Sequence, residues 1–304
     1  MQAAAGANIV RGDGRGAQFS SGANLVTGRM HGLQAAGVNA VGSEMRGLQA
    51  AGGVNLARTG RGAQLAGGVN VAESFTGAQI APINIAGRSD GLQLGVVNYD
   101  EDARSFRLGV VNIGRRTQGF ALGVVNIASR DDGESFALLN LIGNGIHDVS
   151  LFSTDLLLSN LGLKLGGRHL YTLIALGYQP GDDLAPGPEH FVRGDRRWAM
   201  GLGVGWRFPL ELGRLTYVEL EASNFELRST LDNWDTAPEI ASLRVQAGIR
   251  LMQRMTLLVG AGANVAWGIN GRDADLGLGL PESVSRSGGT TVRVYPGFLV
   301  GLQI

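Results

Sequence analysis

Large apolar residues occupy every second position at the start of each of three copies of a short unit along residues 91–127. At the start of this stretch, Leu92, Leu94 and Val96 alternate with small or polar residues such as Gln93. A period of two with one bulky apolar face is typical of a strand that is buried on one side only. The pattern therefore predicts a strand of about ten residues and a turn of about four in each copy of the unit.

The same unit returns throughout the first half of the chain, in looser copies rich in Ala and Gly before residue 90. One asparagine marks every copy, at steps of 14 to 16 residues: Asn8, Asn24, Asn39, Asn55, Asn70, Asn84, Asn98, Asn112, Asn126 and Asn140. Repetition at a fixed period must be explained before any other feature of the fold. We expect ten strands from residues 1–141.

Two architectures place a strand every 14 or 15 residues. In a β-solenoid each repeat is one rung, and every turn occupies an equivalent edge. In an up-and-down barrel the turns alternate between the two ends. The turns at 11–15, 42–46, 73–76, 100–104 and 130–134 contain acidic residues, whereas the intervening turns are mainly basic. This alternation favours hairpins, and therefore an antiparallel barrel.

The second half of the chain alternates large residues with small ones, most regularly along 198–208. Trp198 and Trp206 are eight positions apart, which is roughly 26 Å along a strand and roughly 20 Å after a tilt of about 40°. That separation matches the two aromatic girdles of a membrane barrel. We therefore predict an aromatic girdle formed by Trp198, Trp206, Phe208 and Trp267.

The connections of the second half alternate in length. Long ones cover residues 179–196, 228–238 and 268–290, and short ones cover 209–214 and 252–254. Long external loops and short periplasmic turns are the habit of bacterial outer-membrane barrels. The acidic turns of the repeats fall on the same side as the long loops, so one barrel would run through both halves.

The predicted fold is all-β: an antiparallel up-and-down transmembrane β-barrel of about 18 strands, in the range 16–18. It forms one domain over residues 1–304, with repeat strands in 1–141 and longer hairpins in 142–304. In this barrel the leucines of the repeat face lipid, Gln93 faces the lumen and Asn98 marks a rim. The alternative is an N-terminal β-solenoid over 1–141 attached to an eight-stranded barrel.

Composition excludes several other classes of protein. Gly accounts for 49 of 304 residues, which argues against a helical protein because each interior Gly costs a helix about 1 kcal/mol. The chain has no Cys, so a disulfide framework or a Cys-based metal site is impossible. Net charge is zero and basic residues are scattered, which argues against nucleic acid as a partner. Because no signal segment opens the chain, we expect a mature form whose signal has been removed.

The repeats resemble a bacterial outer-membrane surface-repeat family, built from Gly-Leu-Gln-Leu-Gly-Val-Val-Asn-type units that precede outer-membrane hairpins. The match covers residues 32–141 well and 1–31 loosely, and residues 160–178 resemble the junction with the hairpins. The resemblance implies a location in the outer membrane or at the cell surface, and it has no catalytic residues to transfer. The terminal Ile304 departs from the aromatic ending usual in barrels.

Few residues suggest chemistry. His147 and Asp148, with Ser150 and Ser153, are the residue types of a Ser-His-acid hydrolase. Neighbours on one strand point to opposite faces, so we favour a polar strand start. Further candidates are two Arg-Gly-Asp triplets at 11–13 and 193–195 and the loop acids Asp232, Asp235, Asp273 and Asp275. We favour chance triplets over adhesion motifs, and solvated acids over a weak Ca²⁺ site.

We therefore predict a non-enzymatic outer-membrane protein without a cofactor or metal, acting as a porin-like channel for small solutes. The residues expected to line the lumen are Gln93, Arg107, Glu219, Glu221, Arg244 and Arg250. The alternative function is a structural or adhesive surface protein with a closed lumen and partner-binding loops. The expected partners are outer-membrane lipid and lipopolysaccharide, with small solutes for a channel and no nucleic acid.

Overall fold

The computed structural model describes residues 1–180, 196–229, 239–269, 282–287 and 290–304. The described residues form strands and turns, with no helix among them. The chain divides into two compact units rather than the expected single barrel domain. The first, here called the solenoid, comprises Met1–Gly145 and Gly166–Arg168. The second, the eight-stranded unit, comprises Ile146–Leu165 and His169–Ile304.

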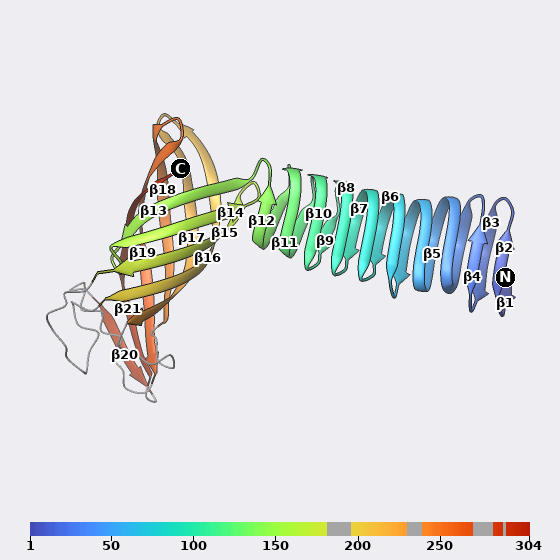
Figure 1. Ribbon diagram of the computed structural model, residues 1–304, viewed down its shortest axis with the longest axis horizontal. Coiled ribbons are helices and arrows are strands. Elements are labelled where there is room, and N and C mark those ends of the chain that lie inside the picture. Colours follow the sequence, from blue (N-terminus) through green and yellow to red (C-terminus); the bar gives the residue numbers. More distant parts are fainter. Residues whose placement is uncertain (181–195, 230–238, 270–281, 288–289) are drawn as a thin grey trace. The chain divides into compact units, whose positions relative to one another are not determined.

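The solenoid is a parallel β-structure of about ten turns, in which each repeat forms one rung (Figure 1). Equivalent residues of successive repeats lie side by side, so that Asn112 pairs with Asn98 on one side and with Asn126 on the other. Its strands are β1 (Gln2–Ala4), β2 (Ala7–Val10), β3 (Gly14–Ser20), β4 (Ala23–Val26), β5 (Met30–Ala66), β6 (Val69–Ile80), β7 (Ile83–Leu94), β8 (Val97–Ala103), β9 (Phe106–Leu108), β10 (Val111–Thr117), β11 (Phe120–Asp131) and β12 (Glu134–Ile142).

The predicted antiparallel barrel of about 18 strands is wrong, because the strands of the repeats pair in parallel. The turn charges that favoured hairpins have another cause. In the stack, acidic and basic turns of neighbouring rungs lie next to each other on one edge and form ion pairs. Arg58 Nε lies 3.1 Å from Glu73 Oε2, and Arg116 Nη2 lies 3.1 Å from Asp132 Oδ2. The alternation of acidic and basic turns therefore reflects ion pairing between neighbouring rungs.

Two ladders of buried amides explain why the rungs stack in register. Each repeated Asn donates from Nδ2 to Oδ1 of the Asn in the next rung, at 2.9 Å from Asn84 to Asn98 and 2.8 Å from Asn98 to Asn112. The glutamines donate in the opposite direction, as from Gln93 Nε2 to Gln79 Oε1 at 2.9 Å. A buried amide without a partner is costly. The ladder bonds form only when equivalent residues stack directly on one another, and the glutamine ladder ends at Gln93, whose Oε1 accepts no hydrogen bond.

The expected orientation of the repeat residues must also be corrected. Gln93 and Asn98 are fully buried inside the solenoid, so neither lines a barrel lumen or marks a rim. In the rungs from residue 91 to 127 the interior holds mainly Asn, Ala and other small or polar residues, and the leucines and valines lie outside. Earlier rungs also bury larger side chains, among them Met30, Met45 and Phe75. Leu92 and Leu94 are half-buried on the outer faces, and Val96 is 53% exposed at a corner.

A column of glycines allows neighbouring rungs to approach closely. Five of these glycines have φ between 122° and 134°: Gly32, Gly47, Gly62, Gly77 and Gly91. A Cβ at Gly77 would lie 2.0 Å from the carbonyl oxygen of Gly62 in the preceding rung. Both the backbone conformation and the contact exclude a side chain, which explains the Gly that precedes the Leu-Gln or Ala-Gln pair in these rungs.

The eight-stranded unit is a closed ring (Figure 1). The pairs from β15 onward are antiparallel, and β13 closes the ring by pairing with β21, as between Ser150 and Gln303. Its strands are β13 (Ile146–Thr154), β14 (Ser159–Gly166), β15 (Leu170–Gln179), β16 (Arg197–Leu212), β17 (Leu215–Ser229), β18 (Glu239–Met252), β19 (Met255–Ile269) and β21 (Thr290–Gln303), while β20 (Ser283–Ser287) pairs only with β21.

Side chains fill the interior of this ring. Glycines on the inner face of β16 make room for aromatic rings of neighbouring strands. A Cβ at Gly201 would lie 2.4 Å from the ring of Phe225, and one at Gly205 would lie 2.1 Å from the ring of Tyr171. An eight-stranded ring has an interior just wide enough for side chains to fill. The filled interior, together with the solenoid in place of ten barrel strands, contradicts the predicted porin-like channel.

Candidate functional site

Charged residues of the solenoid gather along one edge. This charged edge consists of the turns at residues 58–61, 73–76, 87–90, 101–104, 115–118 and 129–132. Between Ala57 and Gly133, every charged side chain that is not buried lies in these turns. The charged side chains of these turns that are not buried comprise seven arginines and five carboxylates, a net charge of +2.

The opposite edge is apolar. It consists of the turns at residues 67–68, 81–82, 95–96, 109–110, 123–124 and 137–138, and its large side chains are about half exposed: Val96 53%, Val110 47%, Val124 47% and Leu138 45%. Each turn wraps closely around the asparagine ladder. A Cβ at Gly109 would lie 2.7 Å from Asn98 Nδ2, so a small residue is needed beside the bulky one.

The two flat faces between these edges are also apolar. Exposed residues of one face include Leu56, Tyr99, Ile127 and Leu141, and those of the other include Leu65, Ile80, Phe106 and Leu108. Neighbouring rungs add to one another, as where the rings of Phe106 and Phe120 stack with centroids 5.5 Å apart. Large continuous apolar surfaces are uncommon on soluble proteins and mark sites that contact a partner or a membrane.

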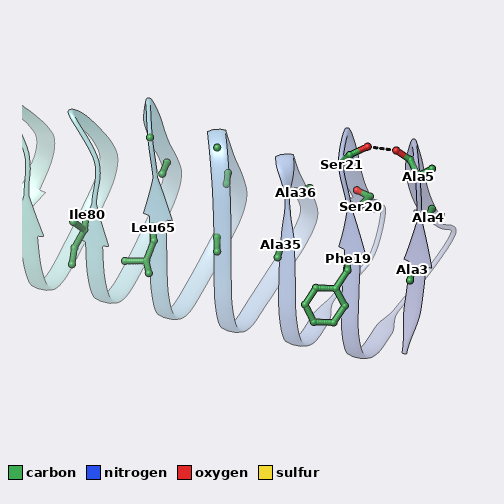
Figure 2. A pocket seen from close by; sticks show the side chains of 15 residues that line it. Ala3, Ala4, Ala5, Phe19, Ser20, Ser21, Ala35, Ala36, Leu65 and Ile80 are labelled. Carbon is green, nitrogen blue, oxygen red and sulfur yellow. Dashed lines mark hydrogen bonds between the residues drawn. The ribbon is translucent and has the colours of Figure 1, made fainter.

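A shallow groove of about 1010 Å³ indents one flat face in the N-terminal rungs (Figure 2). It arises where alanines such as Ala35 and Ala50 stand in the column that holds Phe19 and Leu65 in other rungs. The lining is almost wholly small and apolar, with Ser20 and Ser21 as its only polar side chains. The groove is thus a local thinning of the apolar face, with no group that could do chemistry.

A buried ion pair interrupts the glutamine ladder. The next rung after Gln93 has Arg107 in the ladder position, and this side chain is only 1% exposed. Its Nη2 donates to Thr117 Oγ1 at 2.8 Å and its Nη1 to the carbonyl of Ile113 at 3.1 Å. Asp100 Oδ2 lies 3.9 Å from Nη1, and Asp100 Oδ1 accepts from Gln93 Nε2 at 3.1 Å.

Burial controls the ionisation of this cluster. It raises the pKa of the Asp100 carboxyl from 3.8 to about 6, against the opposing effect of the Arg107 charge. Burial also raises the pKa of Asp131, whose carboxylate accepts from Ser135 Oγ at 2.5 Å and from Gly133 N at 2.9 Å. The same desolvation lowers the pKa of Arg107. The cluster is enclosed in the stack, so we assign it a structural role.

The interior of the eight-stranded unit contains a network of charged groups. Lys164, the one lysine of the chain, lies 2.5 Å from Glu219 Oε2 and 3.6 Å from Glu221 Oε2. Arg207 Nη2 lies 2.6 Å from both Glu219 Oε1 and Asp148 Oδ2. These pairs join strands across the ring. Paired carboxylates of this kind brace the interior, because their oxygens are already occupied by cations.

The six predicted lumen residues lie in different environments. Glu219, Glu221 and Arg244 point into the ring and are buried there, but they belong to a packed interior. Gln93 and Arg107 belong to the solenoid, and Arg250 is exposed near the end of β18. No channel lumen therefore unites them.

The predicted girdle residues lie on the outer surface of the eight-stranded unit. Trp198 is 54% exposed, Phe208 48% and Trp206 38%, while Trp267 is half-buried. The rings of Trp206 and Phe208 are neighbours, with centroids 6.2 Å apart. Trp198 and Trp206 share the outer face of β16 with other large apolar residues, whereas Trp267 lies on β19.

The other candidates assemble no site. His147 is exposed while Ser150 is buried and faces the ring interior, and Asp148 pairs with Arg207, so the hydrolase arrangement is absent from this strand. In the first Arg-Gly-Asp triplet, Asp13 pairs with Arg29 at 3.3 Å. The second triplet and the four loop acids lie outside the described residues.

Sequence reasoning missed the two amide ladders and the Asp100–Arg107 pair. The signal for the ladders was present: an amide recurring at a fixed period is what in-register stacking requires. Among the residues that the structure describes, no group of three or more His, Cys, Asp or Glu could hold a metal ion. Within the same residues, no helix is long and apolar enough to cross a membrane. Comparisons with protein-family models, curated proteins and solved structures found no match.

Proposed function

We propose that this chain is a non-enzymatic structural protein of the bacterial outer-membrane surface. The observation that supports this most directly is the polarity of the eight-stranded unit. Its exterior is apolar at alternate positions of a strand, as at Met200 (65% exposed), Leu202 (56%) and Val204 (43%). Its interior holds buried charges such as Lys164 and Glu219. A protein surrounded by water has the opposite arrangement, whereas this one suits contact with outer-membrane lipid.

The closed interior supports a structural role over transport. Tyr171, Phe225, Leu173 and Leu258 are each at most 2% exposed and fill the ring together with the charged network. The solenoid, held together by repeated amide ladders, provides a long, regular surface. The resemblance of the repeats to an outer-membrane surface-repeat family implies the same location. Membership of that family stays a prediction.

The test is to follow the full-length chain, exported in Gram-negative cells, through membrane fractionation and then into planar bilayers. We expect it in the outer-membrane fraction, resistant to extraction by carbonate or urea, and giving no current above that of the bare bilayer. Recovery in a soluble fraction would overturn the location. A steady conductance from the purified chain would overturn the closed interior.

A further inference from the structure

Polar and apolar side chains lie on different sides of the solenoid. From Val69 to Leu141 the charged edge is the polar side, while the apolar edge and both flat faces are apolar. A protein partner or a second copy laid against the solenoid would cover one face. Apolar residues on three sides call for a medium that surrounds them, and acyl chains are such a medium.

The height of a rung fits one leaflet of a membrane. Five steps along the strand, from Val96 to Glu101, lead from the apolar edge to the charged edge, which is roughly 17 Å at strand spacing. The hydrocarbon core of a bilayer is about 30 Å thick, so one leaflet provides about 15 Å. The apolar part of the solenoid is therefore about as tall as a single leaflet.

Many backbone amides of the apolar edge have partners in neighbouring rungs. In lipid every backbone N–H and C=O needs an internal partner, because no water is available. Gly95 N donates to the carbonyl of Leu108 at 3.0 Å, Val96 N to that of Pro82 at 2.9 Å and Gly109 N to that of Leu122 at 3.1 Å. These bonds remove part of the cost that keeps ordinary loops out of hydrocarbon.

The charged edge suits the headgroup level of a membrane. Between Val69 and Leu141 its turns carry five arginines and five carboxylates that are not buried, so their net charge is zero. Arg104 and Arg115 are exposed and have no carboxylate partner among the residues that the structure describes. Arginines held at this level can donate to the phosphate groups of lipid headgroups. The partner that the whole surface fits is therefore a phospholipid leaflet.

We propose that the rungs from Val69 to Leu141 lie in one leaflet of a membrane, with the apolar edge among the acyl chains and the charged edge at the headgroups. This rests on the proposed function for its membrane. The solenoid is then a lipid-embedded wedge, and its repeats are a way of extending that wedge one rung at a time.

Because the chain has no native Cys, single-Cys variants report position without background. Val110→Cys places a label on the apolar edge, Gln118→Cys on the charged edge, and Leu202→Cys on the exterior of the eight-stranded unit. The full chain, labelled with an environment-sensitive fluorophore, is reconstituted in phosphatidylethanolamine–phosphatidylglycerol vesicles. Each label is then exposed to nitroxide lipids and to aqueous iodide.

We expect the labels at 110 and 202 to shift to the blue and to be quenched by nitroxide lipid, and the label at 118 to be quenched by iodide. Quenching by lipid at 202 but by iodide at 110 overturns the wedge and leaves the proposed function standing. Quenching by iodide at both overturns both. Protection of 110 from both quenchers means that protein, such as a second copy, covers the edge, and this also overturns the wedge.

Discussion

At the scale of single residues, the asparagine ladder stabilises the solenoid because each amide serves both neighbours. Asn98 Nδ2 donates to Asn112 Oδ1 at 2.8 Å and to the carbonyl of Leu108 at 3.1 Å, and its Oδ1 accepts from Asn84. Replacing Asn98 leaves its buried hydrogen-bond partners on the two neighbouring rungs unpaired. A single truncation therefore acts on three rungs at once.

Asn98→Ala should lower the free energy of local unfolding by about 2–3 kcal/mol, since a buried donor and a buried acceptor both lose their partner. Amide hydrogen exchange of β7, β8 and β10 in the full chain measures this. Gln118→Ala, on the charged edge, is the control and should change protection by less than about 0.5 kcal/mol. Equal exchange in the two variants would show that the ladder contributes nothing.

The buried pair Asp100–Arg107 departs from the repeat pattern, and the stacking of the rungs does not require this pair. Most rungs have Ala, Gly or Val in the position of Asp100, and earlier rungs have Gln in that of Arg107. The double change Asp100→Ala with Arg107→Gln should raise the unfolding free energy by about 1–4 kcal/mol, as replacement of buried ion pairs often does. Asp100→Ala alone should destabilise, because it leaves Arg107 charged and unpaired. Hydrogen exchange of β8–β10 measures both, and a double variant less stable than the single one contradicts this account.

The raised pKa of Asp100 gives the solenoid a defined pH dependence. The folded value is about 6 against 3.8 for the free carboxyl, so the folded state holds this proton more tightly. The contribution of Asp100 to the free energy of unfolding is therefore complete below about pH 4 and is lost as the pH rises through 6. This change is on the order of 2–3 kcal/mol. Protection of β8–β10, corrected for intrinsic exchange, should rise from pH 7 to pH 5. Asp100→Asn should weaken that slope, leaving the smaller part due to Asp131; an unchanged slope would rule out this assignment.

At the scale of elements, one rung is two strands joined by a charged turn and an apolar turn. The alternation of apolar and polar residues located these strands, and the recurring asparagine located their repeats. Neither pattern specifies which strands pair with each other. Gln93 avoids lipid equally well in a barrel lumen and inside a solenoid, and turn charges of alternating sign fit both hairpins and stacked rungs. Pairing is decided by the ladders and the glycine column, whose effect depends on contacts between rungs.

Gly77→Ala tests that column. A methyl group would lie 2.0 Å from the carbonyl oxygen of Gly62, at a backbone φ of 127°. We expect a loss of at least about 2 kcal/mol of local stability in β5 and β6, from strain and separation of the rungs. Gly6→Ala is the matched control, because nothing lies within 4 Å of its added carbon. The comparison is made by hydrogen exchange, and equal protection in both variants would contradict the stacking geometry.

At the scale of the whole molecule, the alternating strands of the second half were predictable because a one-sided period of two appears directly in the sequence. The outer face of Trp198, Met200, Leu202 and Val204 follows from this period. Which interior partners meet, such as Lys164 with Glu219 across 55 positions of sequence, depends on ring closure and could not be derived from spacing. In both units large apolar residues line the outside, and the interior combines buried apolar side chains with hydrogen-bonded polar or charged groups.

The central claim is that the repeats stack in parallel, and one pair of double-Cys variants tests it directly. Ile113 lies beside Ile127 in the stack, so Ile113→Cys with Ile127→Cys should form a disulfide under mild oxidation. Ile113→Cys with Phe120→Cys should not, because these residues lie on different strands of one rung and no pairing joins them. An antiparallel hairpin turning at residues 114–119 predicts the reverse. Cross-linking of 113 with 127 alone supports the solenoid, and cross-linking of 113 with 120 alone contradicts it.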